Sequence, residues 1–349
     1  MKKVVNRLPL IFTVFIFVFT FCTSAFLYLN TSGELVAALG NNSVTGGEPL
    51  KDYSIIDMSQ IVKEESNAEA ETAQGGAVQV SASPSNAIGK IHEQFLSPYS
   101  AKLSYNGIYI KNSTGLSVDI KNELASVLEL KIAKISEPQV LIVHTHTTES
   151  YMMEERDYYT AADASRSTDN SKNVTKVGEI IAEALRNGGI GVIHDKTLHD
   201  HPSYNGSYTR AAKTINEYLK KYPSIKVVID VHRDSIAMTG NDKAKPTAEI
   251  NGKKAAQVML VVGSETGSVT GFPNWRQNFR LALRYQQTME AMYPGLARQM
   301  LFASRKYNMN LTKGSMLLEV GTDSNTLEEA CYSGELAGKA LASLLNTLR

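Results

Sequence analysis

Two histidines and a glutamate follow directly on an apolar run in the middle of the chain. Residues 140–143 have the β-branched character of a strand buried on both faces, and the run stops at His144, His146 and Glu149. In open α/β sheets, ligands collect beyond the carboxyl ends of such strands. The spacing from His146 to Glu149 offers a nitrogen and an oxygen ligand from one tight turn, a pair suited to zinc. A third ligand has to come from elsewhere.

A second apolar run ends in the same way. Residues 227–229 lead into Asp230-Val231-His232-Arg233-Asp234. If both strands are parallel and central, His232 projects from the sheet edge that carries His146 and Glu149. Two histidines, one glutamate and a water complete a four-coordinate catalytic zinc site. We therefore predict that His146, Glu149 and His232 bind Zn²⁺.

His144 is an alternative to His146 as the first ligand. The two histidines are two residues apart, so on a strand their side chains would face the same side. The three-residue spacing favours His146 as the ligand, because His146 and Glu149 can then bind the same ion. His144 is then predicted to contact the substrate or a metal ligand. Asp230 could orient a ligand histidine, as carboxylates around metal sites commonly do.

A carboxylate interrupts the last apolar strand. Residues 316–318 run straight into Glu319. Burying an unpaired carboxylate is costly, and a nearby metal with its water would give Glu319 both a partner and a task as general base. The metal lowers the pKa of its water toward about 7, Glu319 takes the proton, and the proton later passes to the departing amide nitrogen. A salt bridge to a helix lysine or arginine is the alternative.

Two further regions are candidates for substrate contacts. Arg233 could hold an oxyanion or a substrate carboxylate, and a structural ion pair with Asp230 and Asp234 is the alternative. Residues 194–204 are too polar for a core and border the same sheet edge. We predict a substrate-lining loop with contacts from His199 and Tyr204, closing on Tyr208 and Arg210. The alternative interpretations of this segment are a second metal site and a solvated loop without a function.

The elements that position these residues alternate along the chain. Strand-like and helix-like runs follow one another from residue 138, which favours a three-layer αβα fold with a mixed, mostly parallel, twisted sheet. Asn251-Gly252 is typical of a two-residue hairpin turn, which makes the sheet mixed. A hairpin near residue 108 and a helix at 120–128 precede this core. The predicted strands are 139–143, 191–194, 226–231, 257–262 and 315–320, and the predicted helices are 174–186, 208–221, 274–292, 296–305 and 326–345.

The first 90 residues have a different character. Residues 8–29 carry no charge and are long enough to span a bilayer, which takes about 20 apolar residues. Basic residues before them place the tail, residues 1–7, in the cytoplasm and the rest outside. Residues 30–90 are rich in Gly, Ser and Glu and predict a flexible linker, with the catalytic domain at 91–349. Cleavage as a signal peptide near Ala25 is the alternative.

The composition excludes two classes of protein. The chain has 349 residues with 36 basic and 35 acidic side chains, a balance that gives no reason to expect nucleic acid. Its two cysteines, Cys22 and Cys331, provide neither a disulfide framework nor a cysteine-rich metal site. Any metal therefore depends on histidine and carboxylate ligands.

Four ordered motifs resemble one family, the stage II sporulation protein P family. They cover roughly residues 105–345, and together they are far more specific than any one alone. The motifs are His144-Thr145-His146-Thr147-Thr148-Glu149-Ser150-Tyr151, Asn173-Val174-x-x-Val177-Gly178, His194-Asp195-x-x-x-His199-Asp200-x-Pro202-Ser203-Tyr204 and Asp230-Val231-His232-Arg233-Asp234.

The resemblance implies a membrane-anchored, zinc-dependent N-acetylmuramoyl-L-alanine amidase. Such an enzyme cuts peptidoglycan between glycan and stem peptide, with an additional cleavage of peptide cross-links. The implied fold is that of zinc amidases and metallocarboxypeptidases, in which Glu319 resembles the general base. The implied partners are stage II sporulation proteins D and M, and the implied role is thinning of the septal wall during engulfment. Glu149 departs from ordinary zinc amidases, whose ligand glutamate lies much further beyond the first histidine, and is nearer to the carboxypeptidase spacing.

Two other classes of function compete with the amidase. A metallopeptidase that acts on stem peptides alone would use the same ion and the same base. A non-catalytic wall-binding or scaffold protein would keep a polar cleft without chemistry. Against the second class stands Glu319, which a pure binder has no need to bury.

Overall fold

The computed structural model describes residues 84–134 and 136–349. The predicted cytoplasmic tail, the predicted membrane span at 8–29 and residues 30–83 of the predicted linker lie outside these ranges. Among the helices of the described residues, none combines the length and the apolar character that crossing a membrane requires.

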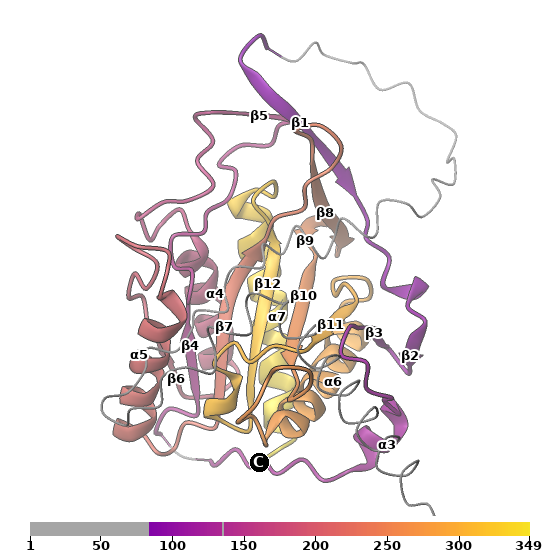
Figure 1. The fold of residues 1–349 in the computed structure, drawn as a ribbon, viewed down its shortest axis with the longest axis vertical. Helices are drawn as coiled ribbons and strands as arrows, with labels where there is room; N and C mark the ends of the chain where they lie inside the picture. Colours follow the sequence, from indigo (N-terminus) through magenta and orange to yellow (C-terminus); the bar gives the residue numbers. More distant parts are fainter. Residues whose placement is uncertain (1–83, 135) are drawn as a thin grey trace, which may run out of the picture. The chain divides into compact units, whose positions relative to one another are not determined.

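The core is an eight-stranded mixed sheet with the order β2-β3-β11-β10-β12-β7-β4-β6 (Figure 1). β4, β6, β7 and β12 are mutually parallel, and the antiparallel pairs are β10 with β12 and β2 with β3. The predicted mixed, mostly parallel sheet is therefore confirmed. The strands are β2 Leu103–Tyr105, β3 Ile108–Asn112, β4 Val140–Val143, β6 Val192–His194, β7 Val227–Asp234, β10 Val258–Gly263, β11 Met300–Ala303 and β12 Ser315–Thr322.

A second, four-stranded sheet has the order β5-β1-β8-β9. The predicted hairpin joins β8 (Lys243–Ile250) to β9 (Lys253–Ala256), and both residues of its Asn251-Gly252 turn have positive φ. β5 (Tyr158–Thr160) pairs with β1 (Ala87–Gln94). Residues 87–90 were predicted to belong to a flexible linker, and this is wrong because their backbone forms part of β1.

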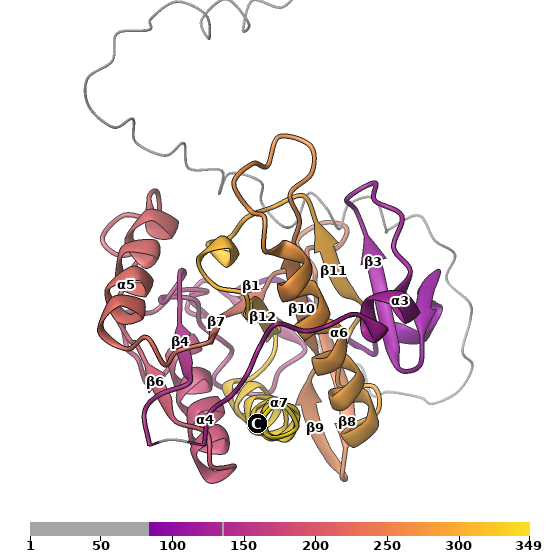
Figure 2. The same ribbon diagram turned by 90° about the horizontal axis from the view of Figure 1, so that it is seen from below.

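Helices cover both faces of the large sheet (Figure 2). α4 (Val174–Asn187), α6 (Trp275–Met292) and α7 (Leu327–Asn346) pack on one face, with Val140 and Ile142 of β4 beneath them. α5 (Ser207–Lys221) packs on the opposite face over Leu141 and Val143. The alternation of side chains along β4 thus supplies two cores, and the three-layer arrangement follows. A short helix, α3 (Ile120–Ala125), lies against α6.

The predicted helix at 296–305 is wrong, since this segment contains strand β11. Leu, Ala, Arg, Gln and Met favour a helix here by intrinsic propensity. β11 lies between β3 and β10, and its residues are buried on both faces of the sheet. Met300 and Phe302 join the core under the helices, whereas Leu301 and Ala303 join the core on the other face. Burial in two cores outweighs the weak local preference.

Helix α7 begins at a complete capping box. The Thr326 side chain accepts a hydrogen bond from the Glu329 backbone N–H, and the Glu329 carboxylate accepts one from the Thr326 backbone N–H. We expect Thr326→Ala to lower the free energy of unfolding by about 1 kcal/mol, because the buried Glu329 backbone N–H loses its partner. Urea titration followed by circular dichroism measures this change. Thr326→Ser, which keeps the hydroxyl, is the control, and equal loss in both variants would contradict the role of the cap.

Candidate functional site

A cavity of about 190 Å³ lies where β4, β7 and β12 end. The four residues predicted for metal binding and base catalysis, His146, Glu149, His232 and Glu319, all line it. These three strands are parallel neighbours in the sheet, so their carboxyl ends meet at one edge. The sequence predicted that these segments meet at one edge of the sheet, and the structure places the four residues there.

His146 and Glu149 share one tight turn after β4. The Glu149 backbone N–H donates to the His146 carbonyl at 3.0 Å, which closes the turn. Both side chains are buried, with exposed fractions of 6%. Burial lowers the pKa of His146 to about 4, so its ring is neutral near pH 7. The neutral imidazole is the form that binds a metal.

His232 lies between two carboxylates. Its Nδ1 is 3.3 Å from Glu149 Oε2, and its Nε2 is 2.9 Å from Asp230 Oδ1. Burial by itself would lower the pKa of His232, but the two carboxylates outweigh burial and raise it well above the usual value. Burial would likewise raise the pKa of Glu149, yet its contact with His232 makes the net shift downward. Ligation of a metal by His232 requires loss of this proton.

Glu319 lies beside His232 on the neighbouring strand. The two residues are register partners between β12 and β7, so their side chains share one face of the sheet. Burial and the nearby Asp234 raise the pKa of Glu319 to about 8. Its Oε2 is buried without a hydrogen-bond partner. Within the described ranges, no lysine or arginine nitrogen comes within 4.0 Å of it, so the alternative of a helix salt bridge is not realised.

The donors at this cavity match those that zinc accepts. Two imidazoles and one carboxylate form a known ligand set, and His146 Nδ1 is buried without a hydrogen-bond partner. Among residues 84–134 and 136–349, the three-residue group whose ligand atoms lie within 4.8 Å of one another is instead Glu93, Glu155 and Glu329. The donors of the predicted zinc ligands are therefore spaced more widely than this limit.

The prediction that His144 contacts the substrate is wrong. Its side chain is fully buried and lies outside the cavity. The ring contacts the Val231 carbonyl through Nδ1 at 2.8 Å and His194 Nε2 through its own Nε2 at 2.9 Å. β4 ends at Val143, so the chain already turns at His144, and the side chains of His144 and His146 diverge. The prediction that the two side chains face the same side assumed a continuing strand, and β4 ends before His144.

His199 is likewise a structural residue. It is buried, its Nδ1 contacts the His144 carbonyl at 2.8 Å, and its Nε2 contacts Thr214 Oγ1 of α5 at 2.9 Å. It does not line the cavity, so the predicted substrate contact is wrong. Arg210, also placed at this loop, donates to the carbonyls of His199, Ser203 and Asn205 and so holds the loop together.

Arg233 lines the cavity but has its donors occupied. Its guanidinium donates to the backbone carbonyls of Ser150, Ser165 and Asp234, and the residue is 7% exposed. The predicted ion pair with Asp230 and Asp234 is wrong, because carbonyl oxygens take the place of those carboxylates. A substrate carboxylate has little access to the guanidinium, since each of its nitrogens already donates to a carbonyl and the residue is buried. Asp234 pairs instead with Arg298 at 2.8 Å.

Tyr204 lies where the sequence predicts it, at the wall of the cavity. Its ring stacks on His146 with centroids 4.4 Å apart, and its hydroxyl is 3.1 Å from His146 Nε2. Tyr208 of α5 contacts the same imidazole edge-on, and Tyr307 lies next to Tyr208. The two aromatic rings beside His146 shield it from water.

Sequence reasoning missed Arg166. This residue lines the cavity, and its side chain is 40% exposed. It lies in a polar loop before α4 with no periodic pattern around it, so the only available signal was a charged residue beside Ser165 and Ser167. The tertiary fold brings the loop to the site, because Arg166 and Glu149 form an isolated β-bridge.

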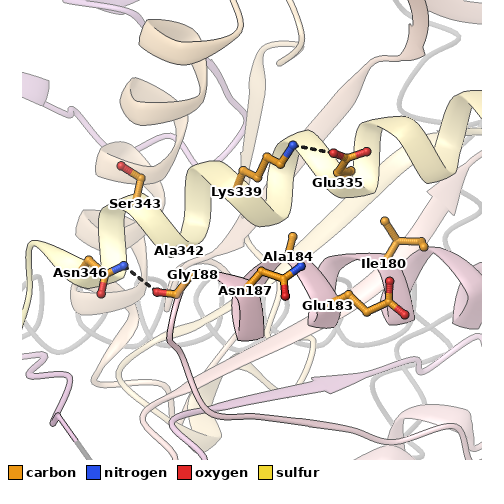
Figure 3. Close-up of a pocket in the computed structure, with 10 residues that line it drawn as sticks. All are labelled: Ile180, Glu183, Ala184, Asn187, Gly188, Glu335, Lys339, Ala342, Ser343 and Asn346. Carbon is orange, nitrogen blue, oxygen red and sulfur yellow. Dashed lines mark hydrogen bonds and ion pairs between the residues drawn. The ribbon is translucent and has the colours of Figure 1, made fainter.

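A larger cavity, of about 450 Å³, lies between α4 and α7 (Figure 3). Lys339 pairs with Glu335, and the Asn346 amide donates to the Gly188 carbonyl. The residues that line this cavity include no histidine, cysteine or aromatic side chain. Its two carboxylates, Glu183 and Glu335, have no imidazole or thiolate beside them, unlike the carboxylates of the smaller cavity.

The fold and the cavity define an α/β protein with two histidines and two glutamates at the edge of a mixed sheet. Residues 36–342 match the family model of Stage II sporulation protein P. A curated relative, Stage II sporulation protein P of Bacillus subtilis strain 168, is 32% identical over 216 residues, which cover 59% of this chain and 50% of the relative. The chain thus spans about half the length of that relative. It belongs to the Stage II sporulation protein P family.

Two solved structures are also similar to this chain. The N-acetylmuramoyl-L-alanine amidase AmiC2 of Nostoc punctiforme has 10% identity and a TM-score of 0.35, over 60% of this chain and 96% of that chain. The CwlD amidase from Clostridioides difficile, in complex with the GerS lipoprotein, has 11% identity and a TM-score of 0.37, over 60% of this chain and 98% of that chain.

Gly178 of α4 is packed against the buried histidine pair beneath the site. A Cβ atom added there would lie 2.6 Å from the ring of His144 and 2.8 Å from His194. We expect Gly178→Ala to lower the free energy of unfolding by about 1–3 kcal/mol, through overpacking, although alanine favours helices. Chemical denaturation measures it. Lys176→Ala, at an exposed position of the same helix, is the control, and a more stable Gly178→Ala protein would contradict the tight packing.

Proposed function

We propose that this chain is a peptidoglycan hydrolase, a zinc-dependent N-acetylmuramoyl-L-alanine amidase. One observation carries the proposal: His146, Glu149, His232 and Glu319, which come from three separate segments, line one cavity at the carboxyl edge of the sheet. These residue types suit metal-assisted amide hydrolysis. Membership of the Stage II sporulation protein P family supports the same activity, since the resemblance of the motifs implies an amidase.

The cavity residues have distinct tasks in this proposal. His146, Glu149 and His232 would hold Zn²⁺, which when bound supplies a Lewis acid and lowers the pKa of water. Glu319 takes a proton at its unpartnered Oε2 from the water that adds to the amide carbonyl. It returns this proton to the nitrogen as the C–N bond breaks, which leaves a carboxylic acid and an amine. The pKa of Glu319 is raised to about 8 without a metal, so the carboxyl is then mostly protonated near pH 7, and a bound cation would favour the ionised form that can act as a base. Asp230 orients the His232 ring, and Tyr204 shields His146 from solvent.

The proposal extends to the setting of the enzyme. We infer that residues 8–29 anchor the chain in the cell membrane and that the catalytic domain acts outside the cytoplasm on septal cell wall during engulfment. Stage II sporulation proteins D and M are the proposed partners, by family resemblance. The proposed fold class is that of zinc amidases and metallocarboxypeptidases.

Product analysis on purified wall sacculi tests the activity directly. Release of whole stem peptides from intact glycan supports the amidase. Additional cleavage of cross-links would add an endopeptidase activity to it. Cleaved cross-links with every bond between glycan and peptide intact would replace the amidase by a peptidase, and binding of sacculi without any hydrolysis would leave a scaffold protein.

Glu319→Gln tests the general base. We expect this change to abolish most hydrolysis, lowering the rate by about 10²–10⁴-fold, because the amide cannot accept the proton. The measurement is release of stem peptides from sacculi by the full-length protein. Metal content and binding to sacculi should stay at the level of the unmodified protein, which separates loss of the base from loss of folding. Unchanged turnover would reject Glu319 as the base.

His232→Ala tests the ligand set. We expect the variant to retain less zinc after dialysis than the unmodified protein, because one of three protein ligands is lost. Elemental analysis of equal amounts of folded protein measures this. His92→Ala, at an exposed histidine paired with Asp242, is the matched control and should keep its zinc. A full complement of zinc in His232→Ala would remove His232 from the ligand set.

A further inference from the structure

The charged side chains that line the cavity differ in their access to a ligand. Each guanidinium nitrogen of Arg233 donates to a backbone carbonyl, and the residue is only 7% exposed. Glu149, His232 and Glu319 are buried at the back of the site, with exposed fractions of 6%, 3% and 5%. Arg166 is the cavity-lining cation that reaches solvent, since 40% of its side chain is exposed.

The guanidinium of Arg166 is held in one orientation. Its Nη1 donates to Asp200 Oδ2 at 2.7 Å and to Thr148 Oγ1 at 3.2 Å. The Asp200 side chain is fully buried and also accepts hydrogen bonds from the Thr148 backbone N–H and hydroxyl. The guanidinium carbon lies 4.8 Å from the centre of the Tyr204 ring. Ion pair, hydroxyl and ring together leave the side chain little freedom, so little entropy is lost when it binds a ligand.

The second terminal nitrogen of the guanidinium, Nη2, lies near a proposed metal ligand. The hydrogen bonds to Asp200 and Thr148 both come from Nη1, whereas Nη2 lies 3.9 Å from Glu149 Oε1. This separation is too long for a hydrogen bond. Nη2 therefore retains donor capacity next to a proposed metal ligand. A planar guanidinium fixed in this way is suited to an incoming carboxylate, which it can bind in two-point geometry.

We propose that Arg166 forms a carboxylate-binding subsite that selects acidic peptides at this cavity. The inference rests on the proposed amidase activity and adds the substrate class: a peptide that carries a free carboxylate close to the amide that is cut. Arg166 acts here as a specificity residue. Glu319 and the metal ligands act on the amide itself.

A pair of muramoyl dipeptides tests the subsite. The two differ only in the second residue, which carries a free carboxylate in one and a carboxamide in the other. We expect the full-length protein to favour the carboxylate form in kcat/KM by about 10- to 100-fold, the range of a charge-assisted hydrogen bond. In Arg166→Gln this preference should fall to near one, chiefly through a higher KM for the carboxylate form.

Two further variants separate binding from a structural role. Arg166→Lys keeps the charge but loses the planar fork, and its preference should lie between those of the other two proteins. Arg186→Gln removes an arginine of similar exposure on α4 that pairs with Glu179, and its preference should equal that of the unmodified protein. If Arg166→Gln lost activity equally on both dipeptides, Arg166 would merely hold Asp200 in place and the inference would be overturned.

Isothermal titration calorimetry measures binding of the dipeptide directly, so this test of the subsite does not depend on hydrolysis. The carboxylate dipeptide should bind the Glu319→Gln protein about 10-fold or more tightly than it binds Glu319→Gln combined with Arg166→Gln. If neither dipeptide is cleaved but this difference is found, the proposed activity fails and the subsite stands. If both dipeptides are cleaved with equal kcat/KM by the unmodified protein, the subsite fails and the proposed activity stands.

Discussion

The buried carboxylate of Asp230 connects the two segments on which the site depends. Its Oδ1 accepts the Thr145 backbone N–H at 2.8 Å, and its Oδ2 accepts the Thr145 hydroxyl at 2.6 Å. Its Oδ1 also lies 2.9 Å from His232 Nε2. Burial raises the pKa of Asp230, but the charge of His232 and the Thr145 donors outweigh it and lower the pKa. A charge buried in this way persists only when partners surround it, so the turn after β4 and the ring on β7 are held at a defined separation.

A second buried polar network supports the site from the opposite face of the sheet. His144 contacts His194, and His194 Nδ1 lies 3.1 Å from Glu179 of α4. Lys196 joins this carboxylate at 2.5 Å. Burial and the neighbouring His194 lower the pKa of His144 to about 3, so its ring is neutral near pH 7. Of the five histidines in the motifs, His144, His194 and His199 serve packing, whereas His146 and His232 line the cavity.

A cluster of ionic side chains lies where the small sheet meets α7. Its three carboxylates are grouped as they would be at a metal site. Glu93, Glu155 and Glu329 present ligand atoms within 4.8 Å of one another. Lys245 Nζ lies among them, at 3.3, 2.7 and 2.8 Å, and its side chain is 2% exposed. An ammonium group already supplies the cation that these carboxylates need, and the salt bridges join β1 and β8 to α7. The cluster therefore stabilises the packing of the second sheet next to the functional edge.

The amino-acid sequence by itself determined the features that depend on local pattern. The apolar runs of β4, β7 and β12 and the Asn251-Gly252 turn are set by neighbouring residues. The three runs place His146, Glu149, His232 and Glu319 at or just beyond the carboxyl ends of strands. Only the tertiary structure decided where side chains point once a strand has ended, as His144 and His199 show. It also decided that β11 is a strand, because burial on two faces exceeds helix propensity. Arg166 reached the cavity through a pairing between distant loop segments, and such pairings leave no periodic signal in the sequence.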